Sequence, residues 1–351
     1  MTDEPEMNSV AAAAAATAPG ADAGTGMHEA GSDDRVTPDI VLIGQATIDD
    51  IHREDGYESL NTPGGAVLYA TVGASLWSVR IGVVTRFGDD YDPSFSAQAT
   101  ADDARTDWTG VSFLIGESIR DTATYHRDGS RTYRFRSAHR LHELTPVPAD
   151  IPAHMLGARY THLAPASLGQ QLDLVRAIRP SGTAISLDTE RHFLRADRDL
   201  IRPLLAEVDF FIPSLEHLQL IFESDESNPR AFWPYLRDLG PSFVVCKWGA
   251  LGSYVFDVHR RLGWHIGTVR GLQIDDETGA GDSYCGGFLA GMILSGDIVT
   301  AAAYGTVSSS FVLESLGARV AAHFDPHVAG RRLEQVVRTI PAHPDPLDAR
   351  S

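Results

Sequence analysis

The segment 275–288 has the residue types and spacing of a phosphate site. It reads D-D-E-T-G-A-G-D-S-Y-C-G-G-F, and apolar residues follow at helical spacing from Cys285 onward. A glycine-rich turn at the start of a helix lets the backbone approach a ligand, and its free amides attract an anion. We therefore predict that the backbone amides of Gly279, Ala280 and Gly281 form an anion hole for a transferred phosphoryl group.

Asp282 follows this turn directly, where a carboxylate can take a proton from a hydroxyl group held beside the anion hole. This arrangement predicts phosphoryl transfer to an alcohol, with Asp282 as the general base.

Other interpretations of the same residues remain open. The simplest is a turn in which Asp282 caps a helix. A dinucleotide-binding fingerprint would need glycine at position 284, where this chain has Tyr284. A Walker A loop would need a lysine beside its last glycine, but the only lysine of the chain is Lys247.

The elements that must position these residues are short apolar runs separated by helix-length segments. The run 39–44 ends in glycine and is typical of a buried parallel strand. Alternation of this kind predicts an α/β fold with a mainly parallel central sheet and helices on both faces. The further strand candidates are 81–85, 160–163, 184–187, 210–213 and 243–247.

One region departs from this alternation. The segments 111–115, 122–127 and 130–136 look like strands without crossover helices, and Asp128-Gly129 joins the last two as a hairpin turn. Together with 51–62 they predict a small β-sheet that covers a site at the ends of the main strands. We call this predicted sheet the lid.

The composition limits the classes of partner. Lys and Arg number 29 against 47 Asp and Glu, so the net charge of −18 repels nucleic acids and anionic membranes. We expect a small-molecule substrate, with no nucleic acid and no membrane partner. Because the same field opposes anionic nucleotides, we also expect Mg²⁺ at a nucleotide site. The two cysteines, Cys246 and Cys285, lie in apolar stretches, which favours reduced thiols and a cytoplasmic location.

The termini differ in composition from the rest of the chain. Residues 1–38 are rich in Ala, Gly, Asp and Thr without periodic apolar spacing, and we expect a disordered tail there. The region 39–330 is the predicted domain, and 331–351 is the predicted polar C-terminal tail. The chain has no apolar stretch long enough to span a bilayer.

The segment D-E-T-G-A-G-D-S-Y-C-G-G resembles the second signature of the ribokinase-like, or PfkB-type, carbohydrate kinases. The resemblance extends over about 39–320, because weaker motifs follow in the family's order. It implies a three-layer α/β/α sandwich with a β-sheet lid, and Asp282 as the base. It further implies ATP and Mg²⁺, a sugar, polyol or nucleoside substrate, and a homodimer formed through the lid.

The weaker motifs imply roles for further residues. Asp49 lies at the spacing of the family's sugar-binding aspartate, with Asp50 as the fallback, and Gly64-Gly65 resembles the paired glycines of the first signature. The resemblance therefore assigns substrate binding to Asp49, Gly64 and Gly65. It assigns nucleotide binding to Lys247, Gly249, Gly252, Thr278 and Arg191.

Two departures from the family pattern bear on function. Tyr69 replaces the asparagine that many members have in the first signature, so the acceptor can differ from a free sugar. Ser214 and His217 replace the residues of the family's N-x-x-E motif, which leaves Glu216, one position early, as the candidate metal ligand acting through water. A nucleoside or inositol kinase, or a weakly catalytic sugar- or nucleotide-binding protein, are the alternative functions.

Overall fold

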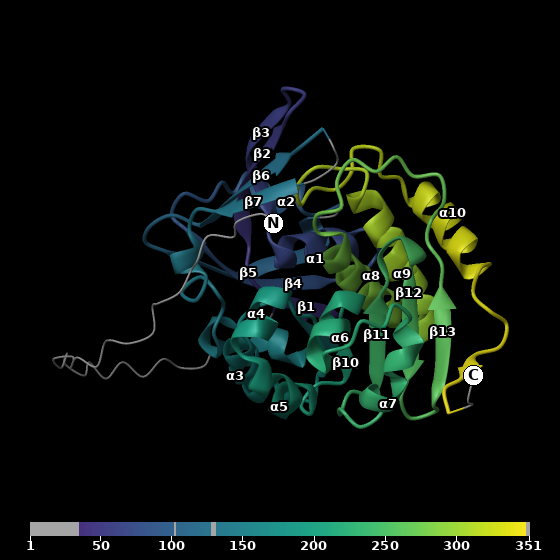
Figure 1. Cartoon of the computed structure of the whole chain (residues 1–351). Coiled ribbons are helices and arrows are strands. Elements are labelled where there is room, and N and C mark those ends of the chain that lie inside the picture. Colours follow the sequence, from purple (N-terminus) through teal and green to yellow (C-terminus); the bar gives the residue numbers. More distant parts are fainter. Residues whose placement is uncertain (1–34, 102, 128–130, 349–351) are drawn as a thin grey trace, which may run out of the picture. The chain divides into compact units, whose positions relative to one another are not determined.

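The computed structural model describes residues 35–101, 103–127 and 131–348. Within these residues the main sheet has ten strands, in the order β14-β13-β12-β11-β10-β9-β8-β1-β4-β5 (Figure 1). Their bounds are β1 Ile40–Ile43, β4 Ile81–Gly88, β5 Thr106–Leu114, β8 Tyr160–Leu163, β9 Ala184–Leu187, β10 Phe210–Phe211, β11 Phe243–Lys247, β12 Ser253–Asp257, β13 Leu262–Ile266 and β14 Asp345–Pro346.

The centre of this sheet is parallel. β1 pairs in parallel with β4 on one side and with β8 on the other, and all four of its residues are buried. A strand buried on both faces must be apolar throughout, which is why the run 39–44 is continuous. The sheet turns antiparallel only from β11 to β14. The predicted mainly parallel sheet is therefore confirmed.

Helices cover both faces of the sheet, as predicted for a three-layer sandwich (Figure 1). One core lies between the sheet and the helices α1, α8, α9 and α10, and the other between the sheet and α3 to α7. The bounds are α1 Ala66–Ser75, α2 Ser94–Gln98, α3 Leu168–Ile178, α4 Arg191–Ala196, α5 Ile201–Leu205, α6 Leu215–Phe222, α7 Trp233–Leu236, α8 Ala280–Ser295, α9 Ile298–Val312 and α10 Pro326–Val337. In the described part of the chain, no helix combines the length and the apolar character that a membrane crossing requires.

The lid is a separate four-stranded sheet in the order β3-β2-β6-β7. Its strands are β2 Thr47–Arg53, β3 Glu58–Gly64, β6 Ile119–Tyr125 and β7 Arg131–Phe135. The prediction that 111–115 belongs to the lid is wrong. Residues 111–114 instead form the end of β5, which pairs in parallel with β4 at the edge of the main sheet, because the strand is longer than its apolar run. The predicted Asp128-Gly129 turn lies outside the described residues.

The C-terminal region is more regular than its composition suggests. The predicted boundary at 330 falls inside α10, and β14 pairs with β13 through Leu262 and Gly263. The prolines at 341 and 344 separate these two elements, so the polar stretch is a connection followed by an edge strand instead of a tail. The predicted N-terminal tail lies outside the described residues up to position 34.

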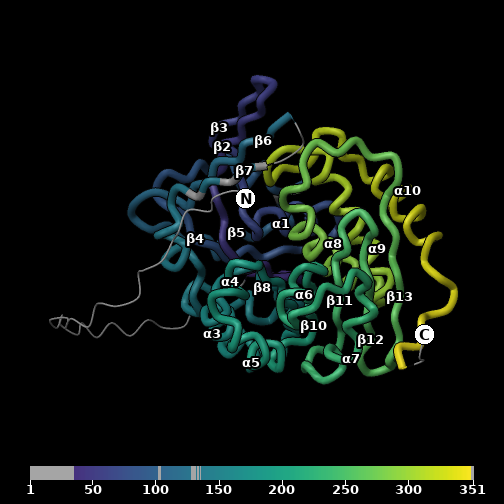
Figure 2. Tube along the Cα trace, in the orientation of Figure 1, coloured from purple at the N-terminus to yellow at the C-terminus, as the bar shows by residue number. Residues whose placement is uncertain are grey.

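Glycines allow α1 and α8 to pack with their backbones in contact (Figure 2). A Cβ atom added to Gly286 would lie 1.9 Å from the carbonyl oxygen of Ala70, and one added to Gly73 would lie 2.0 Å from that of Ser283. Gly287 packs against α9, where an added Cβ would lie 2.1 Å from the side-chain oxygen of Ser308 and 3.0 Å from the carbonyl oxygen of Tyr304. Close packing therefore offsets the low helix propensity of the glycines in α8.

Substitution of Gly286 by alanine tests this contact. We expect Gly286→Ala to lower the free energy of unfolding by about 2 kcal/mol or more, since overpacking outweighs the roughly 1 kcal/mol gain in helix propensity. The measurement is urea unfolding followed by circular dichroism.

Gly330→Ala in α10 is the matched control, because no atom lies within 4 Å of its added Cβ. We expect this variant to be stabilised by about 0.5–1 kcal/mol. Equal effects of the two substitutions would contradict close packing at Gly286.

Candidate active site

The predicted anion hole lies at the N-terminus of α8. Gly279 is its N-cap residue, in the left-handed conformation at φ 73°, and no side chain caps the helix. Among the described residues, the N–H groups of Gly279 and Gly281 donate to no backbone acceptor, whereas the N–H of Ala280 donates to the carbonyl of Glu277 at 3.2 Å. The geometry therefore leaves two of the three predicted amides free to bind an anion.

Asp282, the predicted base, lies in the first turn of α8. Burial raises the pKa of its carboxyl to about 7, and the nearby Asp188 carboxylate adds to the increase, while the Lys247 ammonium opposes it. A carboxyl with a pKa near neutrality is suited to proton transfer at physiological pH. Its position beside the free amides matches the predicted pairing of base and anion hole.

Asp49 and the paired glycines meet at the opposite side of the site. A Cβ atom on Gly64 would overlap Oδ2 of Asp49 at 1.9 Å, and one on Gly65 would lie 2.6 Å from the Cα atom of Ala46. Glycine at 64 therefore leaves room for the Asp49 carboxylate, and glycine at 65 lets the start of α1 lie against the backbone before the strand that carries Asp49. Oδ1 of Asp49 is buried without a hydrogen-bond partner, which suits a carboxylate that awaits a substrate hydroxyl.

Burial raises the pKa of Asp49 to about 7, and Asp121 and Asp276 also contribute to the increase. Asp121 belongs to β6 and pairs in register with Asp49, so both side chains lie on one face of the lid. Sequence reasoning did not select Asp121 or Asp276. In the sequence, Asp121 alternates with the apolar residues Ile119 and Ala123, and this period of two was the available signal that its side chain shares their face of the strand.

Tyr69 lies directly beneath the anion-hole turn. A Cβ atom on Gly279 would lie 2.1 Å from the Tyr69 ring, so the glycine is needed for this contact. The side chain is 3% exposed. Burial raises the pKa of Tyr69, and so do the charges of Asp49, Asp276 and Asp282 around its hydroxyl group. Tyr69 therefore lies between the predicted substrate residues and the predicted base.

Lys247 and two of the other predicted nucleotide-binding residues lie around the end of β11. The Lys247 ammonium donates hydrogen bonds to the Asp188 carboxylate and, at 3.5 Å, to the carbonyl of Gly281. The strand ends in a turn with Gly249 and Gly252 at positive φ, where a Cβ on Gly252 would overlap the carbonyl of Ile266. The structure thus brings Lys247 next to the predicted anion hole, while the two glycines shape the turn that follows.

Arg191 and Glu216 pair with each other at the surface. Their ion pair measures 3.2 Å, and the side chains are 55% and 63% exposed. Ser214 and His217 instead begin α6, where the N–H of Ser214 donates to His217 Nδ1 at 3.3 Å. Burial lowers the pKa of His217 to about 4, so its imidazole is neutral and accepts this bond. Ser214 and His217, which replace the residues of the N-x-x-E motif, therefore cap the N-terminus of α6.

The described residues contain no group of three His, Cys, Asp or Glu side chains placed to hold a metal ion. Mg²⁺ usually keeps several waters and takes only one or two protein carboxylates beside the phosphates. The exposed carboxylate of Glu216 fits such a water-mediated role but not a dedicated metal cage.

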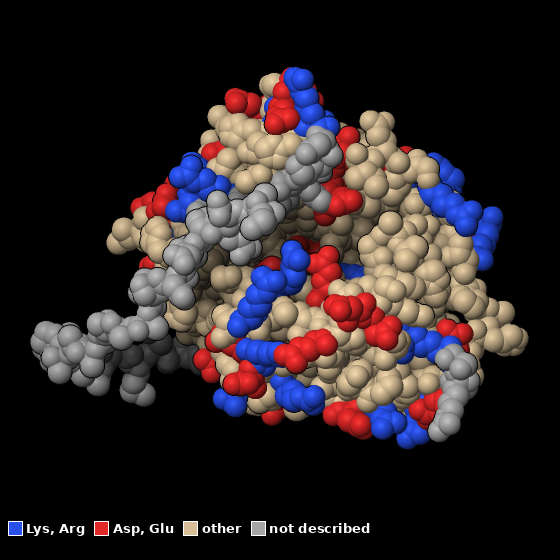
Figure 3. All heavy atoms as spheres, in the orientation of Figure 1, with Lys and Arg blue, Asp and Glu red and all other residues tan. Residues whose placement is uncertain are grey.

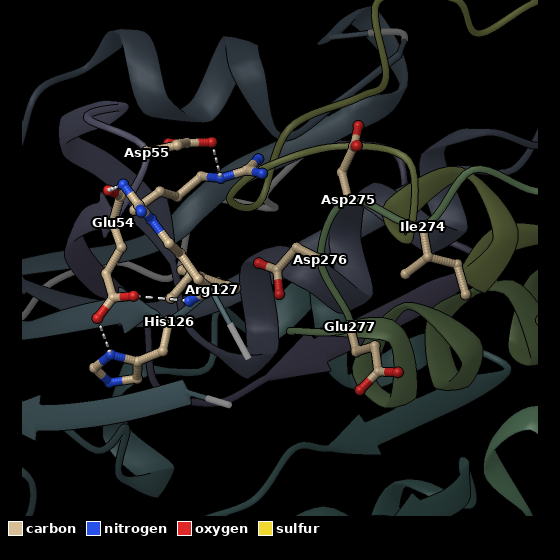
Figure 4. Close-up of a pocket in the computed structure, with 10 residues that line it drawn as sticks. Glu54, Asp55, His126, Arg127, Ile274, Asp275, Asp276 and Glu277 are labelled. Atoms are coloured by element: carbon tan, nitrogen blue, oxygen red, sulfur yellow. Dashed lines mark hydrogen bonds and ion pairs between the residues drawn. The ribbon is translucent and has the colours of Figure 1, made fainter. Parts of the chain in front are cut away.

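The lid contacts the loop before α8. The hydroxyl groups of Tyr125, at the end of β6, and Thr278 lie 3.3 Å apart, and Thr278 also donates to Asp276. Beside this contact is a cavity of about 370 Å³ (Figure 4). It is lined by Arg53, Glu54, Asp55, Tyr125, His126, Arg127, Ile274, Asp275, Asp276 and Glu277.

Residues 163–324 match the pfkB family carbohydrate kinase model. The match includes the segment 275–288 and confirms the resemblance seen in the sequence, while Asp49, Gly64 and Gly65 lie outside it.

Curated relatives extend the similarity toward the N-terminus. A cytidine kinase of Thermococcus kodakarensis is 29% identical over 256 residues, covering 72% of this chain and 88% of the relative. A nucleoside kinase of Methanothermobacter thermautotrophicus is 24% identical over 301 residues, covering 82% and 92%. A fructokinase of Escherichia coli is 26% identical over 278 residues, covering 73% and 85%.

Two solved structures share the fold. Arabidopsis thaliana ribokinase complexed with ribose and ATP aligns with a TM-score of 0.68 and 16% identity, covering 85% of this chain and 99% of that one. A protein described as ribokinase II from E. coli, in complex with ATP and Mg²⁺, aligns with a TM-score of 0.68 and 19% identity, covering 86% and 100%. At these identities the likeness shows the ribokinase-like fold.

The predicted base gives a pH-dependent activity. Because the pKa of Asp282 is raised to about 7, the carboxyl is protonated below that pH and cannot accept a proton. We expect kcat/KM for phosphoryl transfer to rise with pH through about 7 and to level off above it. Asp282→Asn should lower kcat by about 10²-fold or more above pH 7 and should abolish the rise with pH.

Asp49→Asn is the control for this profile, since the pKa of Asp49 is also raised to about 7. The rise near pH 7 should persist in Asp49→Asn if Asp282 is the titrating base. Its loss in that variant, with Asp282 intact, would assign the rise to Asp49.

Proposed function

We propose that this chain, which carries the pfkB carbohydrate kinase match, is an ATP-dependent kinase that phosphorylates a hydroxyl group of a sugar, polyol or nucleoside. The observation that carries the proposal is the Asp282 carboxyl, with its pKa raised to about 7, next to the free amides of the α8 N-terminus. The relatives named cytidine kinase, nucleoside kinase and fructokinase support this class of reaction.

In the proposed reaction the acceptor lies between Asp49 and Asp282. Asp49 accepts hydrogen bonds from acceptor hydroxyls through its unpartnered Oδ1, and Gly64 and Gly65 let the acceptor approach the start of α1. Asp282 removes the proton of the attacking hydroxyl. The amides of Gly279 and Gly281 stabilise the negative charge of the transferred phosphoryl group.

Nucleotide binding is proposed for Lys247, Gly249, Gly252, Thr278 and Arg191. Mg²⁺, when bound with ATP, would neutralise phosphate charge, and Glu216 would contact it through water after releasing Arg191. ADP is the expected product.

Among the acceptors, a nucleoside is favoured by the cavity between the lid and the loop before α8. This cavity shares Asp276 and Tyr125 with the surroundings of Tyr69 and Asp49. Its volume of about 370 Å³ leaves room for a group beyond a sugar ring, and the exposed side chain of Ile274 offers it an apolar wall. A nucleobase attached to the sugar would lie there.

A weakly catalytic binding protein remains the second candidate, favoured by Ser214 and His217 in place of the usual asparagine and glutamate. A homodimer through the lid and a cytoplasmic location remain predictions.

Acidic and basic side chains are interspersed on the face shown in Figure 3, which together with the net charge of −18 favours a small-molecule partner.

The direct assay measures ADP release with ATP and Mg²⁺ across sugars, nucleosides and inositols. We expect acceptor-dependent turnover that falls by about 10²-fold or more in Asp282→Asn, because the base is lost. Calorimetric binding of an acceptor without turnover in the native protein would instead favour the binding protein.

The acceptor class is tested with Ile274→Asp, which places a charge in the cavity wall. We expect KM for the preferred nucleoside to rise by about tenfold, with KM for ATP unchanged, because a nucleobase loses an apolar contact. Leu294→Asp is the matched control, since Leu294 is also exposed and does not line the cavity. Unchanged KM for nucleosides in Ile274→Asp would remove the cavity from the acceptor site.

A further inference from the structure

The only lysine of the chain is buried beneath the predicted anion hole. The chain has 29 Lys and Arg residues, and only the one at position 247 is lysine. The Lys247 side chain is 12% exposed, and that of its ion-pair partner Asp188 is 3% exposed. The two residues come from the ends of neighbouring regions of the sheet, Lys247 from β11 and Asp188 just after β9.

The ammonium group has three partners around the first turn of α8. It donates to the Asp188 carboxylate, to the Gly281 carbonyl at 3.5 Å and to Cys285 Sγ at 3.7 Å. The single S–H of Cys285 can in turn donate to the Gly281 carbonyl, 3.3 Å from the sulfur, or to the Asp188 carboxylate, 3.6 Å from it. The turn that carries Asp282 is therefore held from below by a closed set of contacts.

We propose that Lys247 is a positioning residue for the phosphoryl transfer: paired with Asp188, it fixes the first turn of α8 and places a positive charge beside Asp282. The inference rests on the proposed function and extends it, because a role in holding α8 differs from contact with the nucleotide. The residue acts through Asp282 and the amide of Gly281.

The charges around Asp282 come from several elements. Burial raises the pKa of Asp282, Asp188 and Glu190 also raise it, and Lys247 lowers it. Cys285 on α8 and Tyr69 on α1 also face this carboxyl. Lys247 supplies the only positive charge among these groups, so the ionised base depends on it.

Little room surrounds the ion pair of Lys247 and Asp188. This explains why position 247 is lysine in a chain whose other Lys or Arg residues are all arginines. Nζ of Lys247 lies 3.5 Å from the carbonyl oxygen of Gly281 and 3.7 Å from the sulfur of Cys285, so protein atoms close two sides of the ammonium group. A guanidinium group is larger and planar and requires a wider set of acceptors than this site provides. The charge must therefore be carried by a compact ammonium group.

The inference is tested by carbon-13 NMR of protein labelled at aspartate carboxyl carbons, with the Asp282 signal assigned through its absence in Asp282→Asn. This readout needs no acceptor and no turnover. We expect Lys247→Met to move the midpoint of the Asp282 titration up by about one pH unit and Asp188→Asn to move it down, because each removes one charge of opposite sign. The double variant should titrate near the native midpoint.

Kinetics give the second readout. With the acceptor that shows the highest turnover, an upward shift of one unit lowers activity about fivefold at pH 7, and raising the pH to about 9 restores much of it. Lys247→Arg keeps the charge but not the shape, and we expect it to lose activity at both pH values. If no acceptor is found, the proposed kinase function fails, while the NMR titration still decides the role of Lys247.

Arg179→Met is the matched control, since Arg179 pairs with Asp209 at 2.8 Å near the start of β10, and it should leave the Asp282 midpoint unchanged. An unchanged midpoint in folded Lys247→Met, or equal shifts in Arg179→Met, would overturn the proposal. If Lys247→Met does not fold, the neutral pair Lys247→Met with Asp188→Asn is compared with Asp188→Asn alone. Equal midpoints in these two proteins would also overturn it.

Discussion

The contact between α1 and α8 is the constraint on which the proposed site depends. α1 begins at the paired glycines beside Asp49, and α8 begins at the anion-hole turn. Because Gly73 and Gly286 let the two helix backbones touch, both helix starts are held at a set separation. The same contact places the Tyr69 ring under Gly279. The proposed acceptor and phosphate sites are therefore parts of one packed unit, and a larger side chain at either glycine would displace them together.

Electrostatics act on this packed unit through a few buried groups. Burial and Asp188 raise the pKa of Asp282 to about 7, and Lys247 opposes them. A buried ion pair is weak evidence for stability, since desolvation offsets much of the attraction. The proposed role of the pair of Lys247 and Asp188 is to hold a positive charge beside Asp282, because the pair joins the ends of β9 and β11 to the first turn of α8. The lysine would thus serve the proposed reaction more than the stability of the fold.

The lid adds a second set of carboxylates to the site. Asp49 on β2 and Asp121 on β6 lie side by side on one face of the lid, and Tyr125 reaches the loop before α8. The relative position of the lid carboxylates follows from the register of the lid strands, since a shift by one residue would turn Asp121 away from Asp49.

The segment 111–115 shows what the apolar pattern of a strand cannot predict, namely the sheet to which the strand belongs. Its apolar residues suit either sheet, and only the pairing of 111–114 with β4 assigns these residues to the main sheet.

The sequence by itself determined the features that depend on neighbouring residues: the buried parallel strands, the glycine-rich turn at the start of a helix and the carboxylate that follows it. These follow from local backbone chemistry and periodicity. Only the tertiary structure decided which distant groups share the site. Lys247 meets Asp188 across 59 positions of sequence, and His217 caps α6 instead of leaving a metal ligand at that place. Such contacts could not be predicted because they depend on strand order and helix packing, which bring together residues that no local pattern relates.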